Sequence, residues 1–349
     1  MGTTQQGNKA LSFILLVGGI SLMLAALVLD FKGSAFAHRG SMLVIGMICF
    51  FLGLYLIPSR KNHRKIVYFI FLFPLLFTFG VTVIIPLILG IGYSFTDWTG
   101  IRFTQVVGLA NYTSMFKDPA FIWSVMITFI FAALNIILVN VIAFLLALLC
   151  TSKVKGISFF RTAYFLPNLI GGIVLGYIWQ FVFSNVLISI TKTSWLSQTK
   201  MAMFAIVIVY IWQYAGYIML IYITGLTQVP PDVLEAASID GANEVQTLFG
   251  IKLPMIASSV TICTFLTLTS AFKQFDVNMA LTNGAGSVPN FMGNYLSNGT
   301  QMLALNIYNT AIAKNSYALG QAKAVLFFII LAIVSLVQVR ISNKREVEM

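Results

Sequence analysis

Eight long stretches of this chain carry very few charged side chains, and they constrain its fold more than any other feature. A transmembrane helix needs about 20 consecutive, mostly apolar residues, and most of the stretches reach that length. Because the bilayer core holds no water, backbone polar groups there must be paired within the protein, which favours helices. The sequence therefore predicts an all-α integral membrane protein with about eight transmembrane helices. Their approximate limits are 11–29, 41–57, 66–92, 121–149, 157–184, 201–226, 255–282 and 319–341.

The composition excludes the other broad classes of protein. Of the 349 residues, 59% are hydrophobic and 9% are charged, whereas about 25% are charged in an ordinary soluble domain. So large an apolar share excludes both a soluble globular protein and a disordered chain. The apolar stretches are continuous rather than alternating, which disfavours a β-barrel. The net charge of +11 does not indicate a nucleic-acid partner, because basic residues of membrane proteins gather in cytoplasmic loops.

Basic residues predict the orientation of the chain. They cluster between the second and third spans, between the fourth and fifth, and after the eighth. Because positive charge is retained on the cytoplasmic side, these three places belong to that side, and both termini are expected to be cytoplasmic. The residues are Arg60, Lys61, Arg64, Lys65, Lys153, Lys155, Arg161, Arg340, Lys344 and Arg345.

One predicted cytoplasmic loop, about 227–254, is acidic instead of basic. Pro231 suits the first position of a helix, and Gly241 can take the left-handed conformation that ends one. Asn243 and Gln246 have the spacing of a capping box, which starts a second helix. We therefore expect two short helices joined by a glycine turn. The loop holds four of the ten acidic residues, Asp232, Glu235, Asp240 and Glu244, and its expected apolar anchors are Leu234, Ile239, Val245, Leu248 and Phe249.

Residues in this loop resemble the EAA signature of membrane subunits of bacterial binding-protein-dependent ABC importers. The matching residues are Glu235-Ala236-Ala237, Asp240-Gly241-Ala242, Ile251 and Leu253-Pro254. Segments 94–98, 107–112, 160–167 and 281–284, with Phe275-Asp276, are similar to carbohydrate-importer permeases. The resemblance covers about residues 66–345, so we expect a six-span permease core over 66–349 and an N-terminal extension over 1–65 with two further spans. An interfacial loop without a protein partner is the alternative interpretation of the acidic loop.

The resemblance implies several partners and a location. It implies a second permease subunit, a different chain, together with two ATP-binding cassette subunits, an extracytoplasmic solute-binding protein and a bacterial plasma membrane. ATP and Mg would be bound by the cassette subunits, since the sequence has no G-x-x-x-x-G-K-[ST] motif, and we expect no cofactor, metal or catalytic residue in this chain. The residues expected to couple transport to the ATPase are Glu235, Ala236, Ala237, Asp240, Gly241, Ala242, Leu253 and Pro254. Glu235 would meet a basic residue of the ATPase, and Gly241 would set the angle between the two helices.

Polar residues inside predicted spans mark a candidate solute path, because such residues are costly in a bilayer and usually face a cavity or another helix. The candidates are Tyr210, Gln213, Tyr214, Tyr217, Ser270, Lys273, Gln274, Asp276 and Asn278. Lys273 and Asp276 are three residues apart and are expected to share a helix face as an ion pair. A subunit interface, or an aromatic packing surface for the tyrosines, is the alternative interpretation.

The function predicted from these features is import of a carbohydrate by alternating access, driven by a separate ATPase. Lys273 leaves an acidic sugar open as the substrate. A permease for another small polar solute, such as a polyol phosphate, is the alternative within the family. An ion-coupled secondary transporter would need interrupted helices and ion sites at the midplane, and the sequence shows no matching Gly/Pro-interrupted halves.

Overall fold

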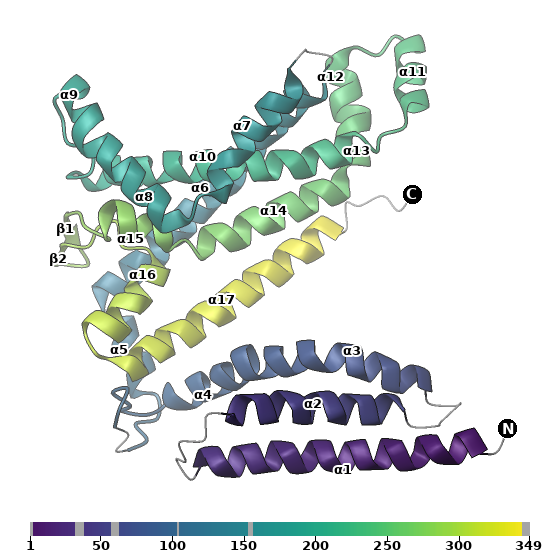
Figure 1. The fold of residues 1–349 in the computed structure, drawn as a ribbon. Helices are drawn as coiled ribbons and strands as arrows, with labels where there is room; N and C mark the ends of the chain where they lie inside the picture. Colours follow the sequence, from purple (N-terminus) through teal and green to yellow (C-terminus); the bar gives the residue numbers. More distant parts are fainter. Residues whose placement is uncertain (1–2, 32–37, 57–62, 103–104, 153–155, 344–349) are drawn as a thin grey trace. The chain divides into compact units, whose positions relative to one another are not determined.

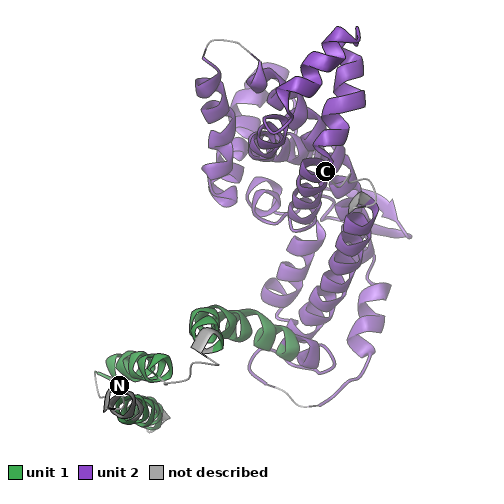
Figure 2. Ribbon diagram, turned by 90° about the vertical axis from the view of Figure 1, so that its right-hand side faces the viewer, with its two compact units in different colours: residues 1–89 green, residues 90–349 purple. Residues whose placement is uncertain are grey.

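The computed structural model describes residues 3–31, 38–56, 63–102, 105–152 and 156–343 (Figure 1). The chain divides into two compact units, Met1–Leu89 and Gly90–Met349, which Figure 2 colours separately. The sequence-based division at residue 65 follows the family resemblance and stays a prediction. Six of the basic residues used to predict orientation lie outside the described residues: Arg60, Lys61, Lys153, Lys155, Lys344 and Arg345.

Helices long and apolar enough to cross a membrane dominate the described residues. There are six of them, or seven if the bent pair Glu244–Met255 and Ala257–Phe272, which meet at 74°, forms one span. A shorter apolar helix covers Gly40–Tyr55. The predicted helical membrane architecture is therefore found, while the count of eight spans stays a prediction. The six are Ala10–Asp30, Val67–Tyr93, Pro119–Thr151, Gly172–Thr191, Thr199–Leu226 and Tyr317–Ile341.

In the first unit, two helices approach each other through glycine. A β-carbon on Gly19 would lie 2.6 Å from the backbone nitrogen of Phe50 and 2.7 Å from the carbonyl oxygen of Gly46. Ser12 donates a hydrogen bond across the same pair to the Gly53 carbonyl, at 2.7 Å. Small residues allow such backbone approach between membrane helices, where dispersion contacts replace the hydrophobic effect. The elements are α1 (Thr3–Phe31), α2 (Arg39–Tyr55), α3 (His63–Phe79) and η1 (Gly80–Ile84).

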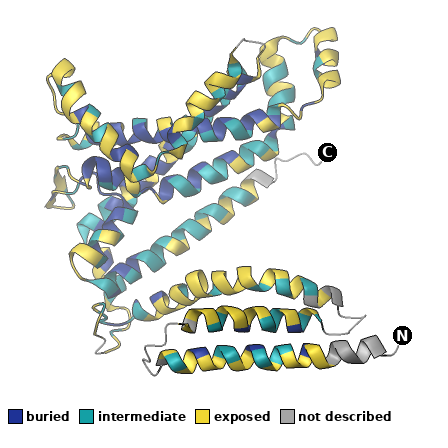
Figure 3. Ribbon diagram, in the orientation of Figure 1, coloured by how far each residue is buried: buried dark blue, intermediate teal, exposed yellow. Residues whose placement is uncertain are grey.

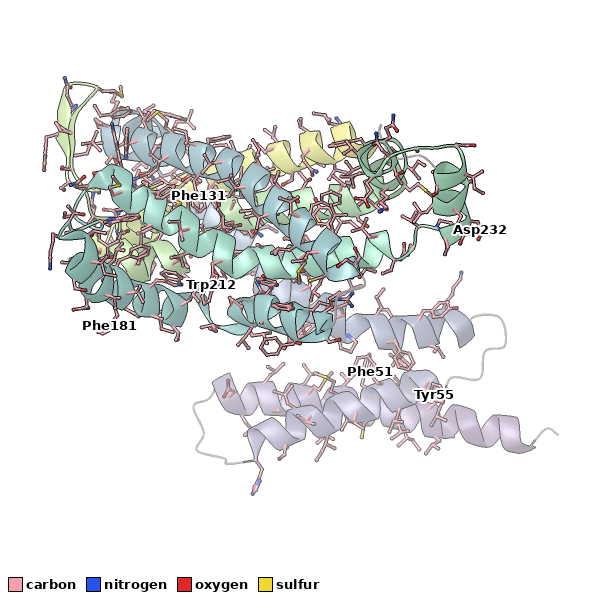
Figure 4. The ribbon with its side chains drawn as sticks, turned by 90° about the horizontal axis from the view of Figure 1, so that it is seen from above. Phe51, Tyr55, Phe131, Phe181, Trp212 and Asp232 are labelled. Carbon is pink, nitrogen blue, oxygen red and sulfur yellow. The ribbon has the colours of Figure 1, made fainter. Side chains whose placement is uncertain are left out.

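Aromatic rings connect α2 to α3 within the first unit. The ring of Phe51, labelled on α2 in Figure 4, lies 5.3 Å from the ring of Phe73. Phe73 in turn stacks on Phe77 at 5.6 Å. Pro74 removes a backbone donor within α3, and the π-helical turn η1 follows at Gly80.

In the second unit, buried residues gather on α6 (Pro119–Thr151), α10 (Thr199–Leu226) and α14 (Ala257–Phe272), as the colours of Figure 3 show. Phe131 and Tyr210, both fully buried, meet edge to face between α6 and α10 at 5.2 Å. Asp118 begins α6, because its carboxylate accepts a hydrogen bond from the backbone of Ala120 and Pro119 follows it. Helix α4 (Ile85–Tyr93) contains the division between the two units, after Leu89. The remaining elements of the second unit before α14 are α5 (Ala110–Lys117), α7 (Ile157–Leu169), α8 (Gly172–Phe181), η2 (Val182–Leu187), α9 (Ile188–Thr191), α11 (Pro231–Ile239), α12 (Glu244–Thr247), η3 (Leu248–Lys252) and α13 (Leu253–Met255).

Two predicted spans are interrupted, which corrects their description as continuous helices. The stretch 157–184 breaks at Ile170 and Gly171, between α7 and α8. Pro167 near the end of α7 and the glycine pair at 171–172 explain this break, since neither residue type favours helix continuation. The stretch 255–282 breaks at residues 273–275, between α14 and α15 (Asp276–Thr282). No proline or glycine marks this second break.

A short β-hairpin is the exception to the predicted all-α fold. It pairs β1 (Val288–Phe291) with β2 (Asn294–Leu296) in an antiparallel ladder. Trp123 of α6 supports it: its ring lies 5.1 Å from Phe291, and its indole nitrogen donates to the Gly299 carbonyl at 2.8 Å. The chain continues with α16 (Leu303–Tyr308), η4 (Asn309–Ala313) and α17 (Tyr317–Asn343). Within this unit the hairpin lies at one end, and α11 lies at the other with the C-terminal end of α17 (Figure 1).

Candidate functional site

The acidic loop folds as the sequence predicts. Helix α11 starts with Pro231 in its first turn, and Gly241 has a φ of +77° directly after its last turn. Asn243 and Gln246 form the complete capping box of α12: the Asn243 carboxamide oxygen accepts from the Gln246 backbone at 2.8 Å, and the Gln246 carboxamide oxygen accepts from the Asn243 backbone at 2.9 Å. Both helix boundaries therefore arise from interactions within a few residues.

Three of the five expected apolar anchors are exposed, which corrects that expectation. Ile239 is 86% exposed, and Val245 and Phe249 are exposed as well. Leu234 and the half-buried Leu248 are the other two, and Leu234 packs on the core of the second unit. Single exposed apolar side chains are common on protein surfaces, whereas contiguous groups of them mark sites that a protein or a membrane covers. The segment therefore presents apolar side chains outward instead of burying all of them against its own chain.

The eight predicted coupling residues lie on this segment with different exposure. Glu235, Ala236, Asp240, Gly241 and Pro254 are exposed, Ala242 and Leu253 are half-buried, and Ala237 is buried. Asp232, on the same helix as Glu235, marks the position of α11 at the end of the second unit in Figure 4. The segment also lines a cavity of about 520 Å³ together with Leu148 and Thr151 of α6. The acidic residues Glu235 and Asp240 and the apolar residues Ile239, Val245 and Phe249 are therefore all accessible at the surface of this segment.

Six of the nine predicted solute-path residues line one cavity. It has a volume of about 350 Å³ and lies where α10 faces the break between α14 and α15. Its polar and aromatic lining comprises Tyr214, Tyr217, Ser270, Lys273, Gln274 and Asp276. The arrangement combines ring faces with hydroxyl, amide, ammonium and carboxylate groups, which is a lining that suits a polar organic solute.

The expected ion pair between Lys273 and Asp276 is absent from the described side chains. The physical reason is the helix break: Lys273 ends α14 and Asp276 begins α15, so the two do not share one helical face. Both side chains are exposed. Gln274, by contrast, is only 6% exposed, and its side-chain nitrogen has no hydrogen-bond partner in the described part of the chain.

The other three predicted path residues lie outside the cavity lining. Tyr210 is fully buried and its hydroxyl lies 2.8 Å from the Ser270 hydroxyl, so it supports a lining residue. Gln213 is buried on α10. Asn278 is buried and holds the loop after the hairpin: it donates to the Thr300 carbonyl at 2.8 Å and accepts from the Met302 backbone at 3.1 Å.

Sequence reasoning missed a buried cation in the last span. Lys323 of α17 is 1% exposed and contacts polar groups from α16, η4 and the residue that begins α6. The signal was present, because a lysine within an apolar stretch indicates a buried partner. The partners themselves are far apart in the chain and could not be identified from spacing.

The sequence is similar to a known family of membrane proteins and to individual members of it. The sequence model described as "Binding-protein-dependent transport system inner membrane component" matches residues 156–347. The chain is 43% identical over 289 residues to the probable starch degradation products transport system permease protein AmyD of Thermoanaerobacterium thermosulfurigenes, covering 81% of this chain and 96% of AmyD. It is 32% identical to the multiple sugar-binding transport system permease protein MsmF of Streptococcus mutans, covering 75% of this chain and 90% of MsmF.

A solved structure shares the fold. It is a bacterial ABC transporter involved in the import of the acidic polysaccharide alginate, and it superposes with a TM-score of 0.68. The matched region covers 82% of this chain and 98% of the other chain, at 18% sequence identity. At this identity the match concerns the arrangement of the helices alone.

Proposed function

Because the chain belongs to the binding-protein-dependent transport system inner membrane components, we propose that it is the membrane-spanning subunit of an ATP-driven carbohydrate importer. The proposed substrate class rests on the 43% identity to AmyD, which extends over 96% of AmyD. That relative is named for the transport of starch degradation products. MsmF, named for multiple sugars, supports the same class. The polyol phosphate alternative is not favoured by these relatives.

The segment from α11 to α13 is the proposed site of coupling to the ATPase. Its exposed apolar residue Ile239 would enter a groove of a cytoplasmic ATP-binding cassette subunit, while the exposed Glu235 would pair with a basic residue there. Gly241 sets the direction of α12 relative to α11 through its positive φ. Closure of the ATPases would then push one rigid element, and the attached spans would alternate between inward-open and outward-open states. ATP hydrolysis itself is assigned to the cassette subunits, where ATP and Mg bind.

The topology and partners follow from the same assignment. The chain is a multi-pass membrane protein, and we assign it to the bacterial plasma membrane with eight spans and both termini in the cytoplasm. The bacterial relatives support the assignment to a bacterial membrane. The proposed orientation is supported by α11, which lies at the same end of the second unit as the C-terminal end of α17 (Figure 1). The complete transporter would contain a second, different permease subunit, two ATP-binding cassette subunits and an extracytoplasmic solute-binding protein.

The cavity between α10 and the break of α14 and α15 is the proposed solute path. Tyr214 and Tyr217 offer faces on which sugar rings stack, and Ser270 offers a hydroxyl to bond sugar hydroxyls. A polar lining in the interior of a helical membrane protein is costly and is retained where it contacts a solute or a partner.

Reconstitution tests the proposed function. The chain, its partner permease and the ATPases are placed in vesicles with the binding protein, and uptake of a labelled maltooligosaccharide is measured with and without ATP. We expect uptake only when ATP, the ATPases and the binding protein are all present, and none with the isolated chain. The sequence shows no matching interrupted halves, which argued against an ion-coupled secondary transporter. Because two spans are interrupted in the structure, uptake driven by an ion gradient without ATP is also measured. Uptake driven by an ion gradient alone would contradict the proposal.

A further inference from the structure

The two interrupted spans cross at their breaks, and Asp276 lies at the crossing. A β-carbon on Gly172, the first residue of α8, would lie 2.7 Å from the Asp276 β-carbon and 2.9 Å from its Oδ2. One turn further along, a β-carbon on Gly176 would lie 2.6 Å from the Ala280 β-carbon. Only glycine on α8 permits this approach. The Asp276 carboxylate is therefore held against the first turn of α8, where free backbone N–H groups favour a negative charge.

The neighbouring residue supplies an unused hydrogen-bond donor. Gln274 lines the same cavity and is 94% buried, since 6% of it is exposed, yet its side-chain nitrogen has no partner in the described part of the chain. A buried donor without a partner is costly, and a bound acceptor would remove that cost. This observation points to a ligand oxygen in the cavity, and it is independent of the position of Asp276.

The cavity lining contains one positive and one negative side chain, and the two do not form an ion pair. Lys273 and Asp276 both line the cavity, and neither side chain forms an ion pair or hydrogen bond in the described residues. The carboxylate can only accept hydrogen bonds and the ammonium can only donate them. A sugar hydroxyl can do both, so it satisfies either group, whereas the ionised carboxylate of a uronate or a fully ionised phosphate group can only accept. The Asp276 carboxylate repels an anionic group placed beside it, and the Lys273 ammonium offsets this repulsion, so an anion gains no net attraction from the pair.

We propose that Asp276 and Gln274 bind the hydroxyl groups of an uncharged sugar unit, and that Asp276 discriminates against anionic solutes. Adjacent hydroxyls of the sugar donate to the Asp276 carboxylate, and the Gln274 amide donates to a further hydroxyl or ring oxygen. Tyr214 and Tyr217 contact the ring faces. Lys273 adds a donor and cancels the charge of Asp276, so the cavity presents no net positive charge to a polyanion. The proposal rests on the proposed function and narrows its substrate to neutral oligosaccharides.

The test compares one neutral and one anionic solute on the assembled transporter. Binding of maltotriose and of its analogue oxidised to a uronate at C6 is titrated on the permease–ATPase complex in detergent, without the binding protein. We expect Asp276→Asn to weaken maltotriose binding roughly tenfold, which corresponds to one charge-assisted hydrogen bond. Binding of the uronate should not weaken, so the preference for the neutral solute falls by the same factor. An unchanged preference overturns the proposal.

A second variant shifts the preference in the opposite direction. Lys273→Gln leaves the Asp276 charge unbalanced, and we expect the uronate to lose more affinity than maltotriose. A loss that is larger for maltotriose overturns the proposal. Asp97→Asn is the matched control, because the Asp97 Oδ1 accepts from the Gln105 backbone at 3.0 Å and an amide oxygen can accept the same bond. ATP-driven maltotriose uptake by the wild-type complex tests the proposed function separately: its absence refutes that function, whereas uptake with an unchanged preference in Asp276→Asn refutes this inference alone.

Discussion

Lys323 of α17 forms an ion pair with Asp118 at the start of α6, with 3.4 Å between Nζ and Oδ2. The same ammonium donates to the side-chain oxygens of Asn306 and Thr310, each at 2.9 Å, and lies 5.1 Å from the centre of the Phe121 ring. These bonds satisfy all three donors of a lysine that is almost completely buried. The network therefore ties three segments together at the end of the second unit that carries the hairpin.

Lys323→Met is expected to destabilise the chain by about 3 kcal/mol, because removing one partner of a buried charge network leaves the others unsatisfied. The loss is limited by Asp118, which is about one-third exposed and can be solvated. The measurement is the thermal unfolding midpoint of the purified protein in detergent. Lys314→Met, which removes an exposed lysine nearby, is the control and should leave the midpoint nearly unchanged. Equal effects of the two substitutions would show that the network does not stabilise the fold.

Gly241→Val is expected to uncouple transport from ATP. At a φ of +77° an L-residue costs about 1–2 kcal/mol, and more when it is β-branched, so the angle between α11 and α12 should change. We expect ATP-driven uptake to fall by about tenfold, the factor to which 1.4 kcal/mol corresponds. Gly250→Val is the matched control: a β-carbon meets no atom within 4 Å at either glycine, and only Gly241 has a positive φ. Full uptake by Gly241→Val would contradict the coupling assignment.

Gly19→Ala and Gly18→Ala are expected to have opposite effects on stability. The new β-carbon at Gly19 would meet the backbone of α2, which cannot rotate away, and we expect a loss of about 1–3 kcal/mol. At Gly18 no atom lies within 4 Å, and alanine should stabilise the helix by roughly 0.5–1 kcal/mol. Thermal unfolding of the two variants in the same detergent gives the comparison. A similar midpoint for both would mean that α1 and α2 do not pack through Gly19.

Asn278→Ala is expected to lower stability without changing the apparent KM for uptake. The substitution removes the bonds to the Thr300 carbonyl and the Met302 backbone, at a cost of about 1–3 kcal/mol. The residue lies outside the cavity lining, so the transporter that remains folded should bind solute normally. Asn185→Ala is the control, because the Asn185 amide bonds within its own helical turn and is exposed. A raised KM with unchanged stability would instead indicate that Asn278 contacts the solute.

The coupling segment was predictable because its structure is local. Pro231, Gly241 and the Asn243–Gln246 pair each act over a few residues. The structure contains the helix start, the glycine with positive φ and the capping box that these residues predict. The roles assigned to the segment remain predictions from family resemblance. The exposure of Ile239 was not predictable, because an apolar residue on a short helix can face either its own chain or a partner.

The lining of the proposed solute path was predictable in part. Polar residues within an apolar stretch identified Ser270, Gln274 and Asp276, which do line one cavity. The ion pair between Lys273 and Asp276 was wrong because the helix breaks between them without a glycine or proline. Asn278 was grouped with the path from its polarity, but polarity alone cannot distinguish a solute contact from a bond to a distant loop.

The sequence by itself determined that this chain is a helical membrane protein with an acidic two-helix segment, because hydropathy, capping and turn preferences depend on neighbouring residues. Tertiary structure decided which polar groups meet. The approach of Gly172 to Asp276 and the bonds of Lys323 to Asp118 and Asn306 join residues far apart in the chain. Such contacts depend on how helices cross and where they break. Packing of backbone against backbone sets those crossings, and the pattern of apolar residues along each helix does not specify them.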